Sequence, residues 1–505
     1  MQNFIERHDA KIKGVISCFD RIVLTGTIPG ICYAEGMTSV LFKKNIQIFD
    51  YTNFVEPMRE EIRLNTEKLA AENGLEIDFI RKKNFRKENR INDIIKQRGS
   101  HPGLVHIFSA MEACTAYKPW HNKKTHKTYL KTAPGKCLHY YFYFITAEFG
   151  LCYLRVPTWA PFRLQFYCNG HNMLASRLSK KKINSKILDN VFVQIDDFNK
   201  AQNLADGINV RRIHRQLDKI VRQYCPIIRH FTHSYHWSFM QIEYATDIIF
   251  KKKNDLKLIY DEIVRTAIHS VKTENIATFL GRKLHGSYQD EMGNNFNTRI
   301  EGTCIKHRMG KVAIKMYDKF GIVLRVETVT NDISFFRHHR RVEHRDGTWE
   351  MKTAPLKKSI YSWTILLELI KASNRRYIEF ISAIDDPTSG IRDLNKISGS
   401  VKEDDRSYRG FNLFDTDDLE LFSAIIRGEF NISGFSNKSL RKVIKGKKGH
   451  QVSRLLKRLR KHGLIKKIGN TYKYYLTALG RRVTATALIL REMYIIPSLR
   501  GIIVR

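Results

Sequence analysis

The sequence lacks the paired cysteines that indicate a zinc site. Its 505 residues include eight cysteines, and no two of them have the CxxC spacing of a zinc ligand pair. Reduced, buried thiols are the ordinary state of such cysteines in the cytoplasm. We therefore expect a cytoplasmic protein without a disulfide framework.

Long apolar runs are also missing. No stretch of about 18 residues is apolar and free of charge, and the first residues, MQNFIERHDAK, contain no apolar segment followed by a cleavage site. These absences predict an intracellular protein with no membrane partner. A Walker phosphate loop, a GxSxG elbow and an HExxH helix are absent too, which argues against ATPase, serine hydrolase and zincin chemistry.

Acidic residues are few compared with basic ones. The chain has 87 Lys and Arg against 50 Asp and Glu, a formal net charge of +37. An excess of this size predicts attraction to a polyanion, and nucleic acid is the first candidate. The hydrophobic content of 43% can supply real cores, and the length suggests about three domains.

Strand and helix patterns alternate in the first part of the chain. Residues 15–25 predict a buried strand, residues 54–73 a helix, and residues 104–111 another strand. Residues 137–168 then contain three β runs typical of an antiparallel meander. We expect residues 1–195 to form an α/β domain that includes this aromatic meander.

Aromatic side chains alternate along the first run of the meander. His139, Tyr141 and Tyr143 fall on one face of the predicted strand, and the residues between and after them fall on the other. One aromatic face can stack unpaired bases. Aromatics on both faces instead favour a two-sided hydrophobic core.

The middle of the chain, residues 196–384, is predicted to be mostly helical, with a β hairpin inserted at 296–345. Residues 241–250 are interpreted as the start of a long amphipathic helix. Residues 385–410 combine turn formers, mixed charge and few large apolar side chains, which is typical of a linker. The predicted fold class is therefore α+β and multidomain, with residues 411–505 as a C-terminal domain.

That C-terminal segment has the clearest pattern. A helix is predicted to begin near Asp417, a second covers residues 437–444, and a third has apolar residues at 452, 455, 456 and 459, at i, i+3, i+4 and i+7. Gly463 ends the third helix. Residues 465–477 then predict a two-stranded ribbon with a Gly-Asn turn, followed by a closing helix.

The order helix, helix, turn, helix, wing, helix resembles a winged helix-turn-helix domain of the MarR-like kind, known from bacterial DNA-binding regulators, particularly in HGLIKKIGNTYKYYLTALGRR. The resemblance implies duplex DNA as the partner, with RNA as an alternative for the rest of the chain and a homodimer as one possible state. Between Glu429 and Glu492 the chain has no acidic residue and 17 Lys or Arg, which favours phosphate contact. The expected DNA contacts are Lys447, Lys448, Gln451, Ser453, Arg454, Lys457, Arg458, Lys461, Lys466, Lys467, Asn470, Tyr472 and Lys473.

Two further basic segments contain aromatic or histidine side chains, KPWHNKKTHKTYLK at 118–131 and FFRHHRRVEHR at 335–345. Both fit contact with a nucleic-acid backbone, although a solvated charged loop is the usual alternative. The expected contacts are Trp120, Lys123, Lys124, Lys127, Arg337, Arg340 and Arg341.

A hairpin at 315–332, KMYDKFGIVLRVETVTND, carries candidate chemistry. Its YxK and LRxE strands resemble those of replication initiators of rolling-circle plasmids and filamentous phages. The resemblance implies that Tyr317 attacks the DNA phosphodiester, and that Glu327, next to Arg325, holds a divalent metal or activates water.

The turn of this hairpin decides which side chains meet. A two-residue turn at Phe320 and Gly321 places Tyr317 on the sheet face opposite Arg325 and Glu327. A three-residue turn with a bulge places all three on one face. The plain alternative is an Arg–Glu pair across a half-exposed hairpin.

Other carboxylates form a second candidate centre. Asp20 lies in an apolar strand and Glu112 follows another, an arrangement similar to the first acids of RNase H-like transposases and nucleases, which implies a Mg²⁺ site. Glu243 and Asp247 lie i, i+4 on a predicted helix and could add to it. Asp20 could equally pair with Arg21 or another cation.

Two functions follow from these patterns. The first is a DNA-binding transcriptional regulator or mobile-element protein, for which the sequence indicates no particular cofactor. The second is a Mg²⁺-dependent nickase, transposase or replication initiator that uses the carboxylates.

Overall fold

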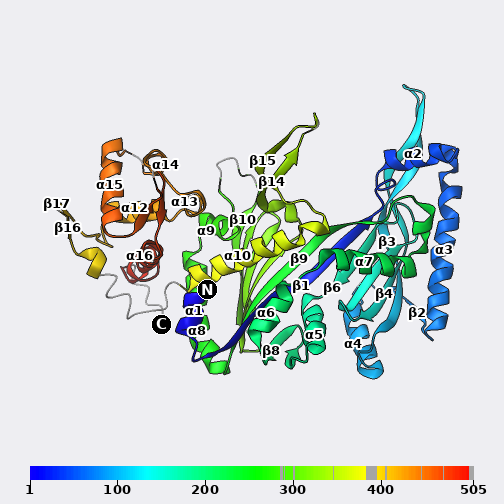
Figure 1. Cartoon of the computed structure of the whole chain (residues 1–505), viewed down its shortest axis with the longest axis horizontal. Helices are drawn as coiled ribbons and strands as arrows, with labels where there is room; N and C mark the ends of the chain where they lie inside the picture. The colour runs from blue at the N-terminus through cyan, green and yellow to red at the C-terminus, as the bar shows by residue number, and fades with distance from the viewer. Residues whose placement is uncertain are drawn as a thin grey trace. The chain divides into compact units, whose positions relative to one another are not determined.

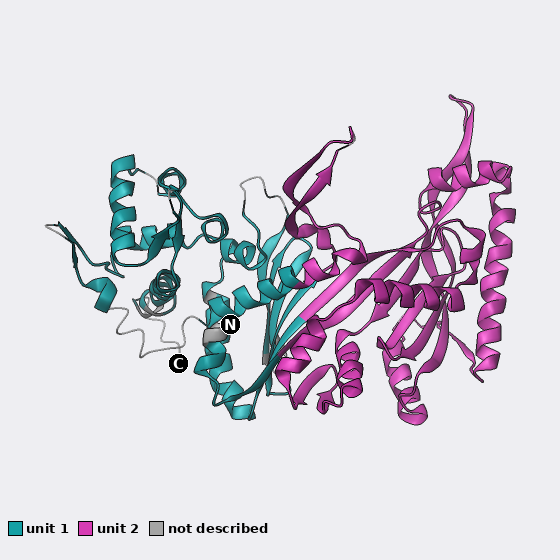
Figure 2. Ribbon diagram, viewed as in Figure 1, with its two compact units in different colours: residues 1–15, 245–329, 368–505 teal, residues 16–244, 330–367 magenta. Residues whose placement is uncertain are grey.

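The computed structural model describes residues 1–82, 84–284, 288, 290–299, 302–344, 346–382, 395–403, 406–444, 446–469 and 471–499. The chain divides into two compact units (Figure 2). Unit 1 comprises residues 1–15, 245–329 and 368–505, and unit 2 comprises residues 16–244 and 330–367. Each unit therefore joins segments that are far apart in the sequence.

Eleven strands form one sheet. One part of β1 and one part of β9 belong to unit 1, and the rest of each strand belongs to unit 2. In unit 2 the strand order is β9-β1-β6-β5-β4-β3-β2, in which β2 pairs with β3 in parallel and the neighbours from β1 to β3 pair antiparallel. The predicted antiparallel meander is thus confirmed as β4, β5 and β6. The strands are β1 (Ile12–Thr27), β2 (Ile77–Phe79), β3 (Gly103–Asn122), β4 (Lys127–Thr146), β5 (Gly150–Pro157), β6 (Leu164–Cys168) and β9 (His236–Phe250).

Around residues 141–144 both faces of β4 are packed, which confirms the two-sided core there. Phe142 and Phe144 contact Tyr224 of helix α7, with ring centroids 4.8 and 4.9 Å apart. Tyr141 and Tyr143 belong to the apolar cluster on the opposite face, beneath helix α4. Neither face of this part of β4 is an open platform for stacking bases.

Helices cover the sheet of unit 2, and short hairpins branch from it (Figure 1). Helix α3 buries Val55, Met58 and Ile62 along one face, as its helical spacing predicts. The elements are α2 (Ala34–Lys43), α3 (Tyr51–Glu72), α4 (Lys87–Arg98), α5 (Gly170–Lys180), β7 (Ser185–Leu188), β8 (Val191–Ile195), α6 (Phe198–Asp206), α7 (Val210–Tyr224), β14 (Arg337–Glu343) and β15 (Trp349–Pro355), with 3₁₀ turns at Ile48–Asp50, Pro226–His230, Ile333–Phe335 and Ile360–Ser362.

In unit 1 the sheet order is β10-β11-β12-β13-β9-β1. The predicted single hairpin is in fact four consecutive strands. Residues 241–250, predicted to be helical, lie in β9, because a strand buried on both faces loses the alternation that would distinguish it from a helix. The elements are α1 (Gln2–Arg7), α8 (Lys253–Ser270), α9 (Thr273–Phe279), β10 (Met292–Arg299), β11 (Gly302–Met309), β12 (Val312–Lys319), β13 (Val323–Thr330) and α10 (Trp363–Ile381), whose first residues belong to unit 2.

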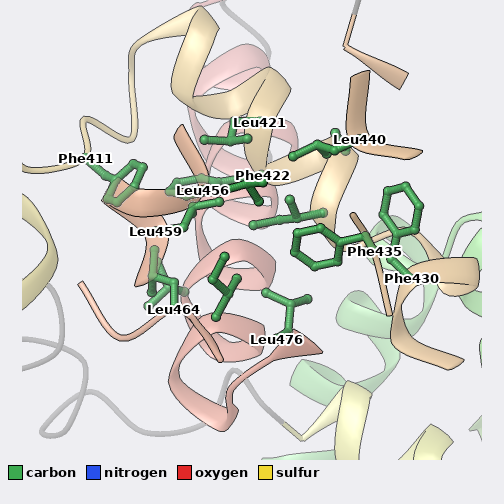
Figure 3. Packing of buried hydrophobic residues seen from close by; sticks show 14 of the residues in the cluster. Phe411, Leu421, Phe422, Phe430, Phe435, Leu440, Leu456, Leu459, Leu464 and Leu476 are labelled. Atoms are coloured by element: carbon green, nitrogen blue, oxygen red, sulfur yellow. The ribbon is translucent and has the colours of Figure 1, made fainter. Parts of the chain in front are cut away.

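The last part of unit 1 has its own apolar core. Leu421 and Phe422 of one helix, Leu440 of the next and Leu456 of a third converge on it (Figure 3). The helices and the ribbon lie where the sequence pattern predicts them. The elements are β16 (Val401–Glu403), β17 (Arg406–Tyr408), α12 (Thr416–Ile425), α13 (Gly428–Ser433), α14 (Asn437–Val443), α15 (Gly449–Lys461), β18 (Ile465–Lys467), β19 (Tyr474–Leu476), α16 (Ala478–Ile489), a π-helical turn (Leu490–Ile495) and α17 (Ile496–Leu499).

Of the predicted linker, residues 385–394 lie outside the described part of the chain, and residues 401–408 form the hairpin β16–β17. Within the described ranges, no helix has the length and apolarity that crossing a bilayer requires.

Candidate nucleic-acid interface and acidic site

Helix α15 has one buried face and one exposed face. Val452 and Leu456 lie in the apolar core, whereas Ser453, Arg454 and Lys457 are exposed. Residues three and four positions apart share one side of a helix. The helix therefore presents a hydroxyl group and two cations together.

Arg458, predicted to contact DNA, is buried instead. Only 7% of the residue is exposed, and its guanidinium donates hydrogen bonds of 2.6 and 2.9 Å to the two carboxylate oxygens of Asp418. It also donates to the backbone carbonyls of Arg409 and Gly410. Arg458 therefore ties α15 to α12 and to the chain before it, and it cannot face a groove of DNA.

Other predicted contacts have partners inside the unit. Lys447 lies 3.4 Å from a carboxylate oxygen of Asp417, and Lys461 pairs with Glu403 of β16. These pairs lower the positive charge at both ends of α15. Arg454 and Lys457 are the exposed cations among those predicted on this helix.

Two polar side chains of α15 also make internal hydrogen bonds. The Gln451 amide oxygen accepts from the backbone N–H of Lys448 at 2.6 Å, which caps the start of the helix. The Ser453 hydroxyl accepts from the side-chain amide of Asn437 at 2.8 Å. That second bond fixes the distance between α14 and α15.

The ribbon after α15 exposes a basic and aromatic surface. Lys466, Lys467 and Lys473 are exposed, and Tyr472 is 84% exposed. The ammonium of Lys467 lies 5.8 Å from the centre of the Tyr472 ring. Asn470, the predicted turn residue, lies outside the described residues.

A third β segment joins this ribbon. Phe435, between α13 and α14, forms an antiparallel bridge with Tyr474, and their backbone hydrogen bonds measure 2.8 and 2.9 Å. Because Tyr474 also pairs with Lys467 across the ribbon, three segments lie side by side.

Two exposed residues of α15, His450 and Arg460, were missed by the sequence interpretation. Arg460 follows Lys457 by three positions, so helical spacing could have identified it. His450 precedes Arg454 by four. Arg460 adds a cation to the exposed face, and His450 adds a polar ring.

In unit 2, Asp20 of β1 lies in a shell of polar groups. The side-chain amide of Asn190 donates to both of its carboxylate oxygens, at 2.8 and 3.0 Å, and Asn169 donates at 3.3 Å. Nδ1 of His171 lies 3.1 Å from one of those oxygens. The shell orients a carboxylate that is only 8% exposed.

Glu243 of β9 approaches Asp20 within unit 2. Each offers a carboxylate oxygen within 4.8 Å of the other. Oxygen ligands sit about 2.1 Å from Mg²⁺, so one ion could bind both carboxylates with a small adjustment. The sequence offers Arg21 as a partner of Asp20. Its Nε instead lies 3.8 Å from a carboxylate oxygen of Glu243.

Glu112 does not join this pair, and the expectation that it lies beside Asp20 is wrong. Strands β6, β5 and β4 separate β3 from β1. The carboxylate of Glu112 instead accepts from the Tyr141 hydroxyl at 2.5 Å and pairs with Arg155 at 2.7 Å. Burial raises the pKa of Glu112, but the hydrogen bond from Tyr141 and the positive charges nearby, first that of Arg155, hold that pKa below its ordinary value.

Asp247 forms a buried ion pair in unit 1. It lies on strand β9 and not on a helix, and its two oxygens accept from Arg325 at 2.6 and 2.7 Å. Asp247 is 1% exposed and Arg325 0%. The alternative of a half-exposed hairpin is wrong at this position, because Arg325 and Glu327 are both buried and Arg325 pairs with Asp247.

The turn between β12 and β13 has three residues, 320–322, and the two-residue alternative is wrong. Phe320 and Gly321 have φ angles of +58° and +71°. The Tyr317 hydroxyl donates to Glu327 at 3.5 Å, and Nζ of Lys315 lies 3.1 Å from the same oxygen. Tyr317 thus lies on the face of Glu327, as a three-residue turn predicts.

The two basic segments form hairpins in unit 2. Trp120 and Lys127 lie near the end of β3–β4, whose turn contains Lys123 and Lys124, all four exposed. On β14–β15, Arg337 and Arg341 are exposed, but Arg340 donates to the backbone carbonyl of Pro355 at 3.2 Å.

Comparisons with protein-family models, curated proteins and solved structures find no match to this chain. Its function is therefore inferred from its own geometry and charge.

Proposed function

We propose that this chain binds duplex DNA through a winged helix-turn-helix domain in residues 411–505. Helices α12, α14 and α15 form its three-helix core, and the ribbon β18–β19 forms its wing. The bridge between Phe435 and Tyr474 adds the third strand that such a wing uses. In this arrangement α15 is the helix that enters the major groove.

The observation that carries the proposal is the exposed face of α15. Its apolar side is fixed in the core, so Arg454 and Lys457 point away from the protein. Arginine can donate two hydrogen bonds to a guanine edge, and lysine can bind phosphate. The absence of acidic residues between Glu429 and Glu492 in the sequence leaves nothing in that segment to repel the DNA backbone.

The test is binding to a short labelled DNA duplex, measured by fluorescence anisotropy over a range of salt concentrations. The double variant Arg454→Ala, Lys457→Ala should bind more weakly, and its log–log salt slope should fall by about one, for the lost phosphate contact of Lys457.

The matched control removes two exposed cations of unit 2, Lys68→Ala with Lys96→Ala, whose side chains are 72% and 77% exposed. If both double variants lose affinity equally, the attraction is a general effect of net charge and α15 is not the interface. Selection of duplexes from a random pool would then define the site for the wild type.

A second candidate function is Mg²⁺-dependent phosphodiester cleavage. The approach of Asp20 and Glu243 within unit 2 favours it, because paired carboxylates on adjacent strands can hold a metal ion. A bound Mg²⁺ would supply charge stabilisation and an activated water. Asn190 and Asn169 would hold the Asp20 carboxylate in position.

Incubation with Mg²⁺ or Mn²⁺ and labelled single-stranded, duplex or hairpin substrates tests this candidate. Asp20→Asn and Glu243→Gln should stop cleavage while DNA binding persists, and Glu112→Gln is the control. Tyr317→Phe and Glu327→Gln test separately for a covalent adduct. No cleavage and no adduct on any substrate would rule the candidate out.

A further inference from the structure

The end of the hairpin β3–β4 is a two-stranded arm with two different faces. Trp120 pairs directly with Tyr129, and Lys118 with Lys131, in an unbroken antiparallel register. Directly paired residues point to the same side of a β ribbon, and alternate residues share that side. All four side chains therefore lie on one face of the arm.

That face is open to solvent. Trp120 is 49% exposed, Tyr129 is 36% exposed, and both lysines are exposed. Nζ of Lys131 lies 4.9 Å from the centre of the Trp120 ring, close enough for a cation–π contact. Lys127 lies on the same face, beyond Tyr129.

The opposite face of the arm is packed. Leu130 is buried, and its backbone N–H donates to the Thr38 hydroxyl of α2 at 3.1 Å. Tyr117 is buried as well and donates to the carbonyl of Ile31 at 2.8 Å. The arm is therefore held by its inner face, and its aromatic and basic face is turned outward.

The hairpin β14–β15 has a similar aromatic and charged face in the same unit, with one acidic residue on it. Arg337, His339, Arg341 and Glu343 alternate with side chains of the other face, and Trp349 lies directly opposite Glu343 on the partner strand. A carboxylate oxygen of Glu343 lies 3.7 Å from Nε of Arg341. The Arg341 guanidinium lies 4.4 Å from the Trp349 ring centre, and Trp349 is 55% exposed. In Figure 1 both hairpins extend from the body of unit 2.

We propose that these two arms bind single-stranded nucleic acid. Unpaired bases would stack on Trp120 and on Trp349, and the lysines and arginines beside each ring would contact the phosphates. Base stacking on an exposed aromatic ring is tolerant of sequence and contributes about 1–3 kcal/mol per base. The partner differs from the duplex proposed for α15, so each surface can be tested alone.

The exposed aromatic rings favour nucleic acid over an acidic protein segment as the occupant, because the positive charge alone would attract both. The sequence has no Asp or Glu between Glu112 and Glu148, a stretch that includes the whole first arm. Exposed indole rings indicate unpaired bases, because bases inside a duplex offer no free face for stacking. Binding of a single strand uses both the exposed aromatic rings and the positive charges, whereas binding of a duplex backbone uses the positive charges alone.

The experiment uses the full chain and a labelled oligothymidylate, with a duplex of equal length in parallel. Trp120→Ala should weaken single-strand binding about five-fold or more, as the loss of about 1 kcal/mol implies, and leave duplex binding unchanged. Trp120→Phe should retain most of the affinity, because phenylalanine can still stack. Trp349→Ala should act in the same way.

Phe79→Ala is the matched control, because Phe79 is 48% exposed on β2 and lies on neither arm. Circular dichroism checks that each variant is folded. If Trp120→Ala behaves like Phe79→Ala, or if duplex affinity falls equally, the proposal is overturned. Retention of single-strand binding by the Arg454→Ala, Lys457→Ala variant would show that the arms act independently of α15.

Discussion

Arg458 of α15 and Asp418 of α12 form a buried ion pair with hydrogen bonds of 2.6 and 2.9 Å. The guanidinium also lies 3.8 Å from the centre of the Phe411 ring. One cation thus joins two helices and the segment before them. The orientation of the exposed face of α15 depends on this internal contact.

Removing the carboxylate should destabilise the C-terminal helices. Asp418→Ala leaves Arg458 buried without its charged partner, a change that typically costs about 3–5 kcal/mol. Denaturant unfolding monitored by circular dichroism measures this. Asp417→Ala, at a side chain that is 65% exposed, is the control and should change stability by less than about 0.5 kcal/mol. If Asp418→Ala and Asp417→Ala lower the free energy of unfolding equally, the pair of Asp418 and Arg458 has no structural role.

Loss of the ion pair between Asp247 and Arg325 should likewise destabilise the sheet of unit 1. Asp247→Asn keeps the shape of the side chain but removes the charge opposite a guanidinium that is 0% exposed. We expect a loss of several kcal/mol, within the range of broken buried ion pairs. Glu243→Gln, on the same strand, should have a smaller effect on unfolding. If Asp247→Asn leaves the free energy of unfolding unchanged, the pair contributes no stability.

Stability should fall in mild acid because of His307. This residue is buried between Asn294 and Tyr377, and burial lowers its pKa to about 3. An unfolded imidazole takes up a proton below a pKa of about 6.5, whereas the folded one stays neutral. Between these values the unfolded state binds more protons, so stability decreases by about 1.4 kcal/mol per pH unit as the pH falls.

His139 of β4 adds to this dependence in unit 2. Burial, together with the charge of Arg155, lowers its pKa to about 4. Unfolding measured from pH 7 to about pH 4 should show the combined slope. His307→Gln should reduce that slope by about one proton, while His126→Gln, at an exposed position, is the control. An unchanged slope in His307→Gln would contradict the prediction.

Mg²⁺ should raise the unfolding temperature of the wild type if Asp20 and Glu243 bind it. A ligand at about 100 times its Kd stabilises the folded state by about 2.7 kcal/mol. Asp20→Asn should lose most of this increase, and Glu112→Gln should keep it. Differential scanning fluorimetry with and without MgCl₂ gives the comparison. An identical shift in all three proteins would place the ion elsewhere.

The sequence by itself determined the local elements and the charge. Apolar spacing in α3 and α15, and the β runs of the meander, predict these elements correctly, because amphipathic periodicity depends on neighbours a few residues away. The sequence pattern predicts the wrong element at β9, because burial on both faces removes the alternation of apolar and polar residues that marks a strand. The excess of lysine and arginine is likewise a property of composition alone.

Only the tertiary structure decided which side chains meet. Asp20 approaches Glu243 because β1 and β9 are neighbours in the sheet, whereas three strands separate β1 from the strand that carries Glu112. Arg458 looks like an exposed cation in the helical pattern, but a distant carboxylate and two backbone carbonyls hold it inside. Strand order and ion pairing join residues far apart in the chain, and no local pattern contains that information.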